Sequence, residues 1–261
     1  MTPNTIIGFY FKEFLCKIKI NIFLFYLYRL YSMISILMPI YNGIEFIDDA
    51  ITSILEQSFK EWELIIGING HSENSEIYKT ACKYVEKSPY KIVVKDLFTI
   101  HGKAEALNAM VFFCKYDYIA ILDVDDIWHP KKLAIQMPYL GKFDVIGTKC
   151  IYFGNSHLTG IIPKLPEGDF SNFDFTEYNP IINSSAVIRK EYAYWNPKWF
   201  GIEDYDLWLS LRFRKCKFFN CPIVAVKHRI HPDSAFNAKG NGLGVPELLD
   251  FWKKGNIKSD I

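Results

Sequence analysis

The sequence predicts an α/β protein built on a central, mostly parallel sheet with a mixed second half. From Met33 onward, short apolar runs alternate with amphipathic segments, which is typical of βα units. The chain has 261 residues, of which 50% are hydrophobic, and no break in composition divides it. This length is enough to bury one substantial core. We therefore expect a single domain with short extensions.

The first half contains four apolar runs that predict strands, separated by segments that predict helices. Strands are expected at residues 34–38, 62–68, 91–94 and 118–122, and helices at 44–57, 74–87 and 103–115. Pro39 is expected to end the first strand, and Asn74 to cap the second helix. In the first helix, Ile47, Ile51 and Ile54 recur at the spacing of one helical face.

In the second half the alternation loosens. Strands are expected at residues 143–152, 185–189 and 223–230, a loop-rich stretch at 154–180, and helices at 204–215 and 247–254. Gly240, Gly242 and Gly244 predict a flexible segment before the last helix. We expect this half to be mixed rather than regularly alternating.

Composition excludes several classes of protein. Lys and Arg number 30 against 29 Asp and Glu, so the net charge is +1 and no global positive field would attract nucleic acid. The six cysteines form no CxxC pair. Their scatter argues against a zinc site and a disulfide framework, and it favours reduced thiols in a cytosolic setting.

The segment at residues 6–31 is rich in Ile, Phe, Leu and Tyr but carries five charged side chains. Its uncharged runs fall well short of the ~20 apolar residues that a membrane-spanning helix needs. No cleavage site of small residues follows it, which disfavours a secretory signal. Two interpretations stay open: a helix packed on the domain or an upstream extension, which we favour, and an interfacial helix on a membrane surface.

Polar residues follow three of the expected strands. They are Pro39 to Gly43, Asn69 to His71, and Asp123 to Asp126. In open α/β sheets, ligands bind outside the carboxyl ends of the strands, near a switch in strand order. We therefore expect these three groups to converge on one site.

The acidic group is the strongest single indication of chemistry. Three carboxylates within four residues, Asp123, Asp125 and Asp126, repel one another and are normally relieved by a cation or by solvent. Mg²⁺ or Mn²⁺ commonly binds through one or two carboxylates plus substrate phosphates, which fits a nucleotide diphosphate. The alternative is a turn in which Asp125 or Asp126 caps the helix after Pro130. A phosphatase of the Asp-x-Asp type would continue with Thr, which this chain lacks there.

Several motifs occur together in an order and spacing that resemble a known family. They are ILMPIYNG at 36–43, SILEQSF at 53–59, WELII at 62–66, DVDD at 123–126 followed by Trp128, Pro130 and Leu133, EDYDLWL at 203–209, and RIHP at 229–232. Over residues 33–234 the chain is similar to glycosyltransferase family 2. The resemblance implies the GT-A fold, a Rossmann-like nucleotide-diphospho-sugar transferase domain. It also implies inverting sugar transfer that depends on Mn²⁺ or Mg²⁺.

The resemblance implies roles for individual carboxylates. Asp123 would approach the ribose of the donor, and Asp125 would coordinate the metal that bridges the two phosphates. Asp204 would be the base that takes the proton from the acceptor hydroxyl, and it is also a candidate cap for the helix that follows. Glu203 would contact the acceptor or orient its loop, whereas Trp208 is expected in the core.

The resemblance also assigns residues around the donor phosphates and base. His231 would complete the metal or diphosphate site, with His228 as the competing candidate, and Arg229 would contact phosphate. Pro39 and Tyr41, after the first strand, would line the donor site.

Two departures from the family pattern concern the donor. Many relatives carry Asp-Asp-Gly-Ser after the second strand, and the second Asp accepts a hydrogen bond from uracil, whereas this chain has Asn69. Because the amide of Asn69 can donate as well as accept, the base need not be uracil. The usual Ala-Arg-Asn is altered at Leu107, and Lys103 is expected to supply the missing cation.

These observations predict a glycosyltransferase domain at residues 33–235, between an extension at 1–32 and a Gly-rich segment with a helix at 236–261. The enzyme would move a hexosyl or N-acetylhexosaminyl group, most simply from a UDP-sugar, in polysaccharide biosynthesis. Its carbohydrate-type acceptor, a hydroxyl on a glycan, lipid or protein, would bind the region at 152–185. The expected location is cytoplasmic, with peripheral membrane contact left open.

Two other functions are alternatives to this one. One is a glycosyltransferase-like module that binds a nucleotide sugar without turnover, and the loss of the Asp-Asp pair supports it. The other is a sugar-nucleotide pyrophosphorylase, which would need a Gly-rich basic loop after the first strand. The residues Tyr41 to Gly43 do not form that loop.

Overall fold

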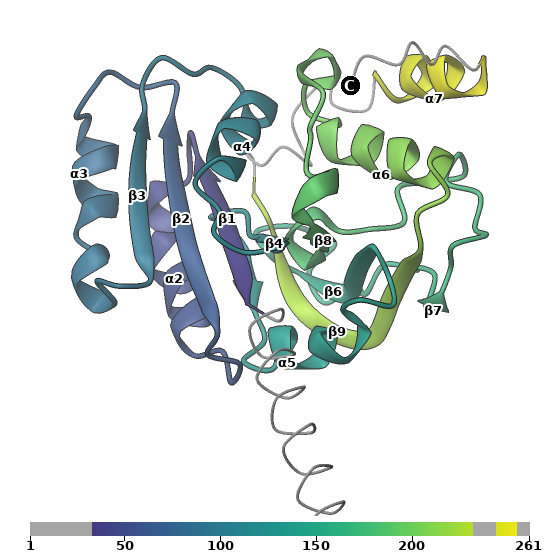
Figure 1. The fold of residues 1–261 in the computed structure, drawn as a ribbon, viewed down its shortest axis with the longest axis horizontal. Helices are drawn as coiled ribbons and strands as arrows, with labels where there is room; N and C mark the ends of the chain where they lie inside the picture. Colours follow the sequence, from purple (N-terminus) through teal and green to yellow (C-terminus); the bar gives the residue numbers. More distant parts are fainter. Residues whose placement is uncertain (1–32, 232–243, 255–261) are drawn as a thin grey trace, which may run out of the picture.

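The computed structural model describes residues 33–231 and 244–254, which form an α/β structure around one sheet (Figure 1). In this part of the chain the sheet has nine strands in the order β3-β2-β1-β4-β8-β6-β9-β5, with β7 paired to β9. The expectations about residues 1–32 and about Gly240 and Gly242 lie outside the described residues.

The first four strands are parallel to one another, as predicted. They are β1 (Ile34–Ile40), β2 (Trp62–Asn69), β3 (Ile92–Leu97) and β4 (Tyr118–Ile121). β2 and β3 lie on one side of β1, and β4 lies on the other. The order of the strands therefore switches between β1 and β4, which is where ligands bind in open α/β sheets.

The remaining strands form the mixed half of the sheet. β6 (Val145–Gly154) is parallel to the long, curved β9 (Phe218–Ile230) and antiparallel to β8 (Val187–Arg189) (Figure 1). The two-residue strands β5 (Ile127–Trp128) and β7 (Gly168–Asp169) are antiparallel to β9. Because Ile127 pairs with Lys227, the residues just before β5 lie opposite the residues just after Lys227.

Helices cover both faces of the sheet. The apolar side chains of α2 (Ile47–Leu55), α3 (Glu76–Cys82) and α5 (Lys132–Gln136) pack on one face. Those of α4 (Lys103–Val111), α6 (Glu203–Phe213) and α7 (Val245–Lys253) pack on the other. Successive residues of a strand point to opposite faces. Both faces of β1 are thus buried, which explains its unbroken apolar run.

β1 continues through Pro39 to Ile40, so the prediction that Pro39 ends the strand is wrong. Pro39 pairs with Gly67 of β2, whereas the pairing of β1 with β4 stops at Leu37 opposite Ile121. The N–H group that Pro39 lacks therefore falls beyond the end of β4, where no ladder hydrogen bond is lost.

The predicted cap of the second helix is also wrong. The side chain of Ser75, not Asn74, accepts a hydrogen bond from Tyr78 N at 3.3 Å and caps α3. Asn74 adopts a left-handed φ of 54°, and its N–H donates to Asp96 Oδ2 at 2.7 Å. α3 ends at Cys82, and a separate 3-10 turn follows at Val85–Lys87.

One further expectation, which concerns Trp208, is confirmed within the described residues. Trp208 is fully buried, as expected of a core side chain. The cysteines described, which are Cys82, Cys114, Cys150, Cys216 and Cys221, are all free thiols. In the same part of the chain, no helix combines the length and the hydropathy needed to cross a membrane.

Candidate active site

The three polar loops predicted from the sequence meet at the carboxyl ends of β1, β2 and β4. His71 Nε2 lies 2.6 Å from the carbonyl oxygen of Tyr41, and the two rings stack with centroids 5.3 Å apart. A methyl group added to Gly43 would lie 3.0 Å from Val124 Cγ1, so the first loop touches the acidic loop. At Gly70, which has a φ of +72°, an added Cβ would lie 2.7 Å from the Tyr41 ring. Only glycine permits this approach.

Asp123 begins the acidic loop directly after the buried end of β4. Its backbone N–H donates to Ser184 Oγ at 3.1 Å, and its carboxylate accepts from Lys103 Nζ at 2.6 Å and Asn183 Nδ2 at 3.1 Å. Burial would raise the pKa of Asp123, but Lys103 and Asn183 lower it overall. The carboxylate is therefore held in its ionised form.

Asp125 faces a histidine from the end of β9. His231 Nε2 lies 3.2 Å from Asp125 Oδ2, and Arg229 Nε donates to the Asp125 carbonyl oxygen at 2.8 Å. Arg229 Nη2 also bonds Asp49 Oδ2 at 2.8 Å, so this guanidinium joins α2 to the acidic loop. Burial and the charges of Asp126 and Asp123 raise the pKa of Asp125 to about 6.

Asp126 has a structural position, and the prediction that Asp125 or Asp126 caps the next helix is wrong. α5 has Lys131 at its N-cap with no side-chain cap. Asp126 is instead completely buried, where it accepts from Arg229 N at 2.8 Å and bonds His228 Nδ1 at 2.9 Å. Burial alone would lower the pKa of His228, but the charges of the acidic loop raise it to about 9. The His228 imidazolium therefore locks β9 to the loop.

Asp204 is the second residue of α6, and it does not cap the helix. The N-cap is Ile202, which makes no side-chain bond, so the capping alternative is wrong. The Asp204 carboxylate accepts from Asn179 Nδ2 at 3.1 Å and from Tyr205 N at 2.8 Å. Burial and the neighbouring Glu203 raise its pKa to about 6, against opposing effects of Lys103 and these two hydrogen bonds.

Lys103 links the two acidic groups electrostatically. Burial would lower its pKa, but Asp123, Glu203 and Asp204 together raise it. The ammonium group therefore stays charged between the loop after β4 and the start of α6. Glu203 is buried at the first position of that helix.

The residues present fit a divalent cation that is shared with a substrate. Within the described residues, no group of three or more His, Cys, Asp or Glu side chains is arranged to hold a metal ion. Asp125 and His231 nevertheless supply one carboxylate and one imidazole, and Mg²⁺ and Mn²⁺ commonly take their remaining ligands from phosphates and water. A cation there would also relieve the repulsion among the three carboxylates.

A family model described as "Glycosyl transferase family 2" matches residues 35–194. The match covers more than half of the chain and includes β1 to β8, with the loops that carry Asn69, Lys103 and the acidic group. The chain belongs to glycosyltransferase family 2. The resemblance read from the motifs is thus confirmed.

Curated relatives of the chain are also named as glycosyltransferases. One is the Escherichia coli "UDP-Glc:alpha-D-GlcNAc-diphosphoundecaprenol beta-1,3-glucosyltransferase WfgD", 28% identical over 79% of this chain and 81% of the relative. Another is the Escherichia coli "O-antigen biosynthesis glycosyltransferase WbnJ", 29% identical over 79% of this chain and 83% of the relative. A third is the "Putative glycosyltransferase EpsE" of Bacillus subtilis, 28% identical over 77% of this chain and 73% of the relative.

Solved structures show that the glycosyltransferase has the predicted GT-A fold. TarS 1-349 of S. aureus in complex with UDP-GlcNAc matches with a TM-score of 0.69 at 14% identity, over 88% of this chain and 68% of that chain. The mannosyltransferase PcManGT of Pyrobaculum calidifontis, in complex with GDP-Man and Mn²⁺, matches with a TM-score of 0.64 at 13% identity. That match covers 87% of this chain and 65% of PcManGT.

Sequence reasoning missed the asparagines that hold the two key carboxylates of the glycosyltransferase. Asn183 binds Asp123, and Asn179 binds Asp204, from one irregular segment between β7 and β8. That segment carries no periodicity or motif that singles them out. The predicted phosphate contact of Arg229 and the donor contacts of Pro39 and Tyr41 stay predictions.

Proposed function

We propose that this glycosyltransferase moves a sugar from a UDP-sugar to an acceptor hydroxyl in one displacement, with inversion at the anomeric carbon. One observation carries the proposal. Lys103 is paired with Asp123 of the acidic loop and lies close enough to Asp204 of α6 for each charge to shift the other's pKa. Donor-side and acceptor-side carboxylates thus flank one cation. A displacement needs both, one to bind the nucleotide and one to accept a proton.

The surroundings of Asn69 support UDP as the nucleotide. Asn69 Nδ2 donates to the Gly102 carbonyl oxygen at 3.4 Å, so the amide nitrogen is directed at the backbone. Its Oδ1 is then the group left to accept a hydrogen bond, as an Asp oxygen would. The exposed Tyr41 ring, stacked on His71, offers a flat surface beside it. TarS, which shares the fold, is solved with UDP and with UDP-GlcNAc.

Asp125 and His231 are the residues that would hold Mn²⁺ or Mg²⁺ together with the donor diphosphate. When bound, such an ion neutralises negative charge on the departing diphosphate. Arg229 acts here as a positioning residue, because its Nε holds the Asp125 carbonyl and its Nη2 holds Asp49. The solved PcManGT complex, which contains Mn²⁺, supports this use of the site.

Asp204 is the proposed base. A pKa of about 6 leaves its carboxylate ionised at neutral pH yet more basic than an ordinary aspartate, which favours proton transfer from an attacking hydroxyl. Asn179 and the Tyr205 N–H fix the direction of this carboxylate. Glu203, next to Asp204 at the start of α6, raises its pKa further.

For the acceptor, we propose a sugar joined through a diphosphate to a lipid. WfgD, 28% identical over most of both chains, is named for such an acceptor, and WbnJ is named for O-antigen biosynthesis. The group moved would be a hexosyl or N-acetylhexosaminyl unit. The transferase domain at 33–235 would then work in the cytoplasm with peripheral contact to the membrane that holds its acceptor.

The decisive experiment measures nucleotide release from UDP-, GDP- and dTDP-sugars, with and without Mn²⁺, in the presence of a GlcNAc-diphosphate-lipid acceptor. We expect release from a UDP-sugar that requires both Mn²⁺ and acceptor. Asp125→Asn should weaken Mn²⁺-dependent donor binding by at least about tenfold, since it removes a charged ligand. Lys95→Gln is the control, because Lys95 lies on β3 and its ammonium group lies over the Phe113 ring.

Each outcome of this experiment bears on the proposal. Release from a GDP- or dTDP-sugar alone would overturn the proposed nucleotide. Tight, Mn²⁺-dependent donor binding without transfer to any carbohydrate acceptor would favour a binding module without turnover. Equal activity of wild type and Asp125→Asn would remove Asp125 from the metal site.

A further inference from the structure

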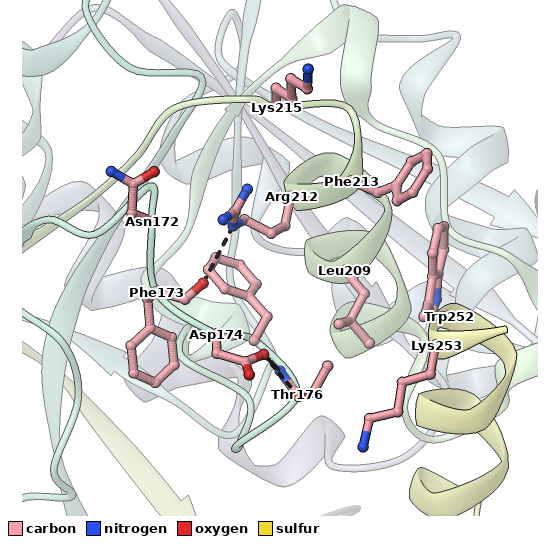
Figure 2. Close-up of a pocket in the computed structure, with 11 residues that line it drawn as sticks. Asn172, Phe173, Asp174, Thr176, Leu209, Arg212, Phe213, Lys215, Trp252 and Lys253 are labelled. Carbon is pink, nitrogen blue, oxygen red and sulfur yellow. Dashed lines mark hydrogen bonds between the residues drawn. The ribbon is translucent and has the colours of Figure 1, made fainter. Parts of the chain in front are cut away.

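A cleft of about 400 Å³ opens between α6, α7 and the segment at 172–176, away from the acidic loop (Figure 2). No part of the proposed catalysis uses it. Its volume falls in the range of ~300–1,000 Å³ that small-molecule sites occupy. The side chains that give it its character are Phe173, Arg212, Phe213, Lys215, Trp252 and Lys253.

The cleft is positively charged. Three cations, Arg212, Lys215 and Lys253, line it with one carboxylate, that of Asp174. Asp174 is already bonded by Thr176 N at 2.9 Å and Thr176 Oγ1 at 2.8 Å. Among the described residues, neither Lys215 nor Lys253 has a carboxylate within salt-bridge distance. The charges of Lys253 and Arg212 also lower the pKa of Asp174, but the three cations outnumber this one carboxylate, so the cleft presents net positive charge to a ligand.

Arg212 is held in place to meet such a ligand. Its Nε donates to the Phe173 carbonyl oxygen at 3.3 Å, as Figure 2 shows, which fixes the plane of the guanidinium. A fixed guanidinium presents paired N–H donors that match the oxygens of phosphate.

The same cleft has an apolar side. Phe213 is 52% exposed, and its ring centroid lies 5.9 Å from that of Trp252. Trp252 Nε1 donates to the buried Asp206 at 2.8 Å, which holds the indole of α7 against α6. Cations beside exposed aromatic rings suit a ligand that joins a phosphate to an apolar chain, because the cations bind the phosphate and the rings contact the chain.

The cleft and the proposed base are built from the same two elements. Asp204 and Arg212 lie eight residues apart on α6, which is about 12 Å along the axis of a helix. The segment that contributes Phe173 to the cleft continues to Asn179, which holds Asp204. A hexose and a diphosphate together can span such a distance.

We propose that this cleft binds the diphosphate and the first part of the lipid of the acceptor, so that the acceptor sugar reaches Asp204. The inference rests on the proposed function and names the residues that would select a lipid diphosphate. Arg212, Lys215 and Lys253 bind the phosphates, and Phe213 and Trp252 contact the lipid chain. The glycosyltransferase would then distinguish acceptors by their carrier as well as by their sugar.

The test compares two acceptors with the same sugar, GlcNAc linked through a diphosphate to an alkyl chain and the phosphate-free alkyl glycoside. Arg212→Gln and Lys253→Gln should each raise KM for the diphosphate acceptor by about tenfold, the usual effect of losing a charge-assisted hydrogen bond. KM for the phosphate-free glycoside and for the UDP-sugar should not change.

Two neighbouring residues provide matched controls. Arg214, whose guanidinium lies over the Tyr192 ring, and Lys254, which pairs with Asp250, do not line the cleft. Arg214→Gln and Lys254→Gln should leave both KM values unchanged. Equal effects in the cleft variants and these controls, or equal effects on the two acceptors, would overturn the proposal.

A binding measurement separates this inference from the proposed function. An alkyl diphosphate without sugar should bind the full chain in calorimetry, and the double variant Arg212→Gln, Lys253→Gln should lose that binding even if no acceptor is glycosylated. Undiminished binding by the double variant would overturn the cleft but not the transferase. The proposal would also fail if the variants lose only sedimentation with phosphatidylglycerol vesicles, because the cleft would then bind membrane headgroups.

Discussion

The parallel half of the sheet (β1 to β4) holds the proposed donor loops, and the mixed half (β5 to β9) lies on the proposed acceptor side; we call them the donor half and the acceptor half. The two halves are stabilised in different ways. In the donor half, β1 pairs with β2 over seven consecutive residues, and helices pack on both faces in regular βα order. In the acceptor half, β7 and β8 have two and three residues, and the register of β6 with β9 shifts around Lys149. β6 and β9 still form a long backbone ladder from Val145 to Gly154, and side-chain amides bond the irregular segment beside it. Asn220 Nδ2 alone bonds the carbonyl oxygens of Pro166 and Pro180.

The site residues of the two halves are also held in different ways. The loops that carry Tyr41 and Asn69 follow β1 and β2, which pair with each other over seven residues. In the irregular segment between β7 and β8, Asn179 and Asn183 hold Asp204 and Asp123 by side-chain hydrogen bonds, which add to those from Tyr205 N and Lys103. A single substitution should therefore disturb the acceptor half more than the donor half.

The largest expected effect is on catalysis at Asp204. Asp204→Asn keeps the shape of the side chain but removes the base, so kcat should fall by about 10²- to 10⁴-fold. Donor affinity, measured by calorimetry with UDP, should not change. Asp206→Asn is the matched control for kcat, because Asp206 is also a buried carboxylate of α6 with a pKa raised to about 6, yet it bonds Trp252 Nε1 and takes no part in the proposed proton transfer. Comparable loss in both variants would contradict the assignment.

The pH profile gives the next largest effect. As a base, Asp204 must be ionised, so the rate should rise with pH, reach half its plateau near pH 6 and be about tenfold lower at pH 5. kcat should be measured at saturating donor and Mn²⁺, so that titration of Asp125 does not contribute. Because Lys103 lowers the pKa of Asp204, Lys103→Gln should move the midpoint upward. A flat profile between pH 5 and 7 would contradict proton transfer to Asp204.

Asn220→Ala tests the stability of the acceptor half. It would leave the buried carbonyl of Pro180 and the partly buried carbonyl of Pro166 without their donor, and a buried group left so costs about 1–3 kcal/mol. We expect a loss of at least ~2 kcal/mol in urea unfolding, with acceptor KM raised more than donor KM. Ser35→Ala removes a donor to Glu63 and an acceptor of Tyr116 N in the donor half. Glu63 keeps its bonds from Lys115, so we expect a smaller loss of ~1–2 kcal/mol. A larger loss of unfolding free energy in Ser35→Ala than in Asn220→Ala would contradict the comparison between the halves.

The smallest effect is expected at the nucleotide base. Asn69→Asp would exchange the amide that donates to Gly102 for an acceptor-only carboxylate, as in many relatives. If Oδ1 already serves as the acceptor for uracil, UDP affinity should change by no more than a few-fold. A large gain in UDP affinity would indicate that Asn69 selects another base.

The sequence predicted regular elements well and irregular contacts poorly, for a local reason. The predicted ends of β2 and β4 lie within one residue of the observed ends. An apolar run that forms a strand can be recognised from the residues of the run itself. The predictions for Pro39 and Asn74 are wrong because residues distant in sequence determine the local structure there. β4 ends before Pro39, so Pro39 needs no hydrogen-bond partner on that side. Asp96 accepts a hydrogen bond from the Asn74 N–H. In the acceptor half, β9 begins five residues before its predicted start, because β6 and β7 provide partners that periodicity does not reveal.

The amino-acid sequence by itself determined the fold class, the family and the candidate donor carboxylates. Strand periodicity and the motifs at strand ends each depend on a few residues that are neighbours in the sequence. Only the tertiary structure decided that His231 meets Asp125 while His228 locks Asp126, and that two asparagines hold the site. It alone brought α7 onto α6 to form the basic cleft. Those contacts join residues distant in sequence, and packing sets them through the combined geometry of several elements.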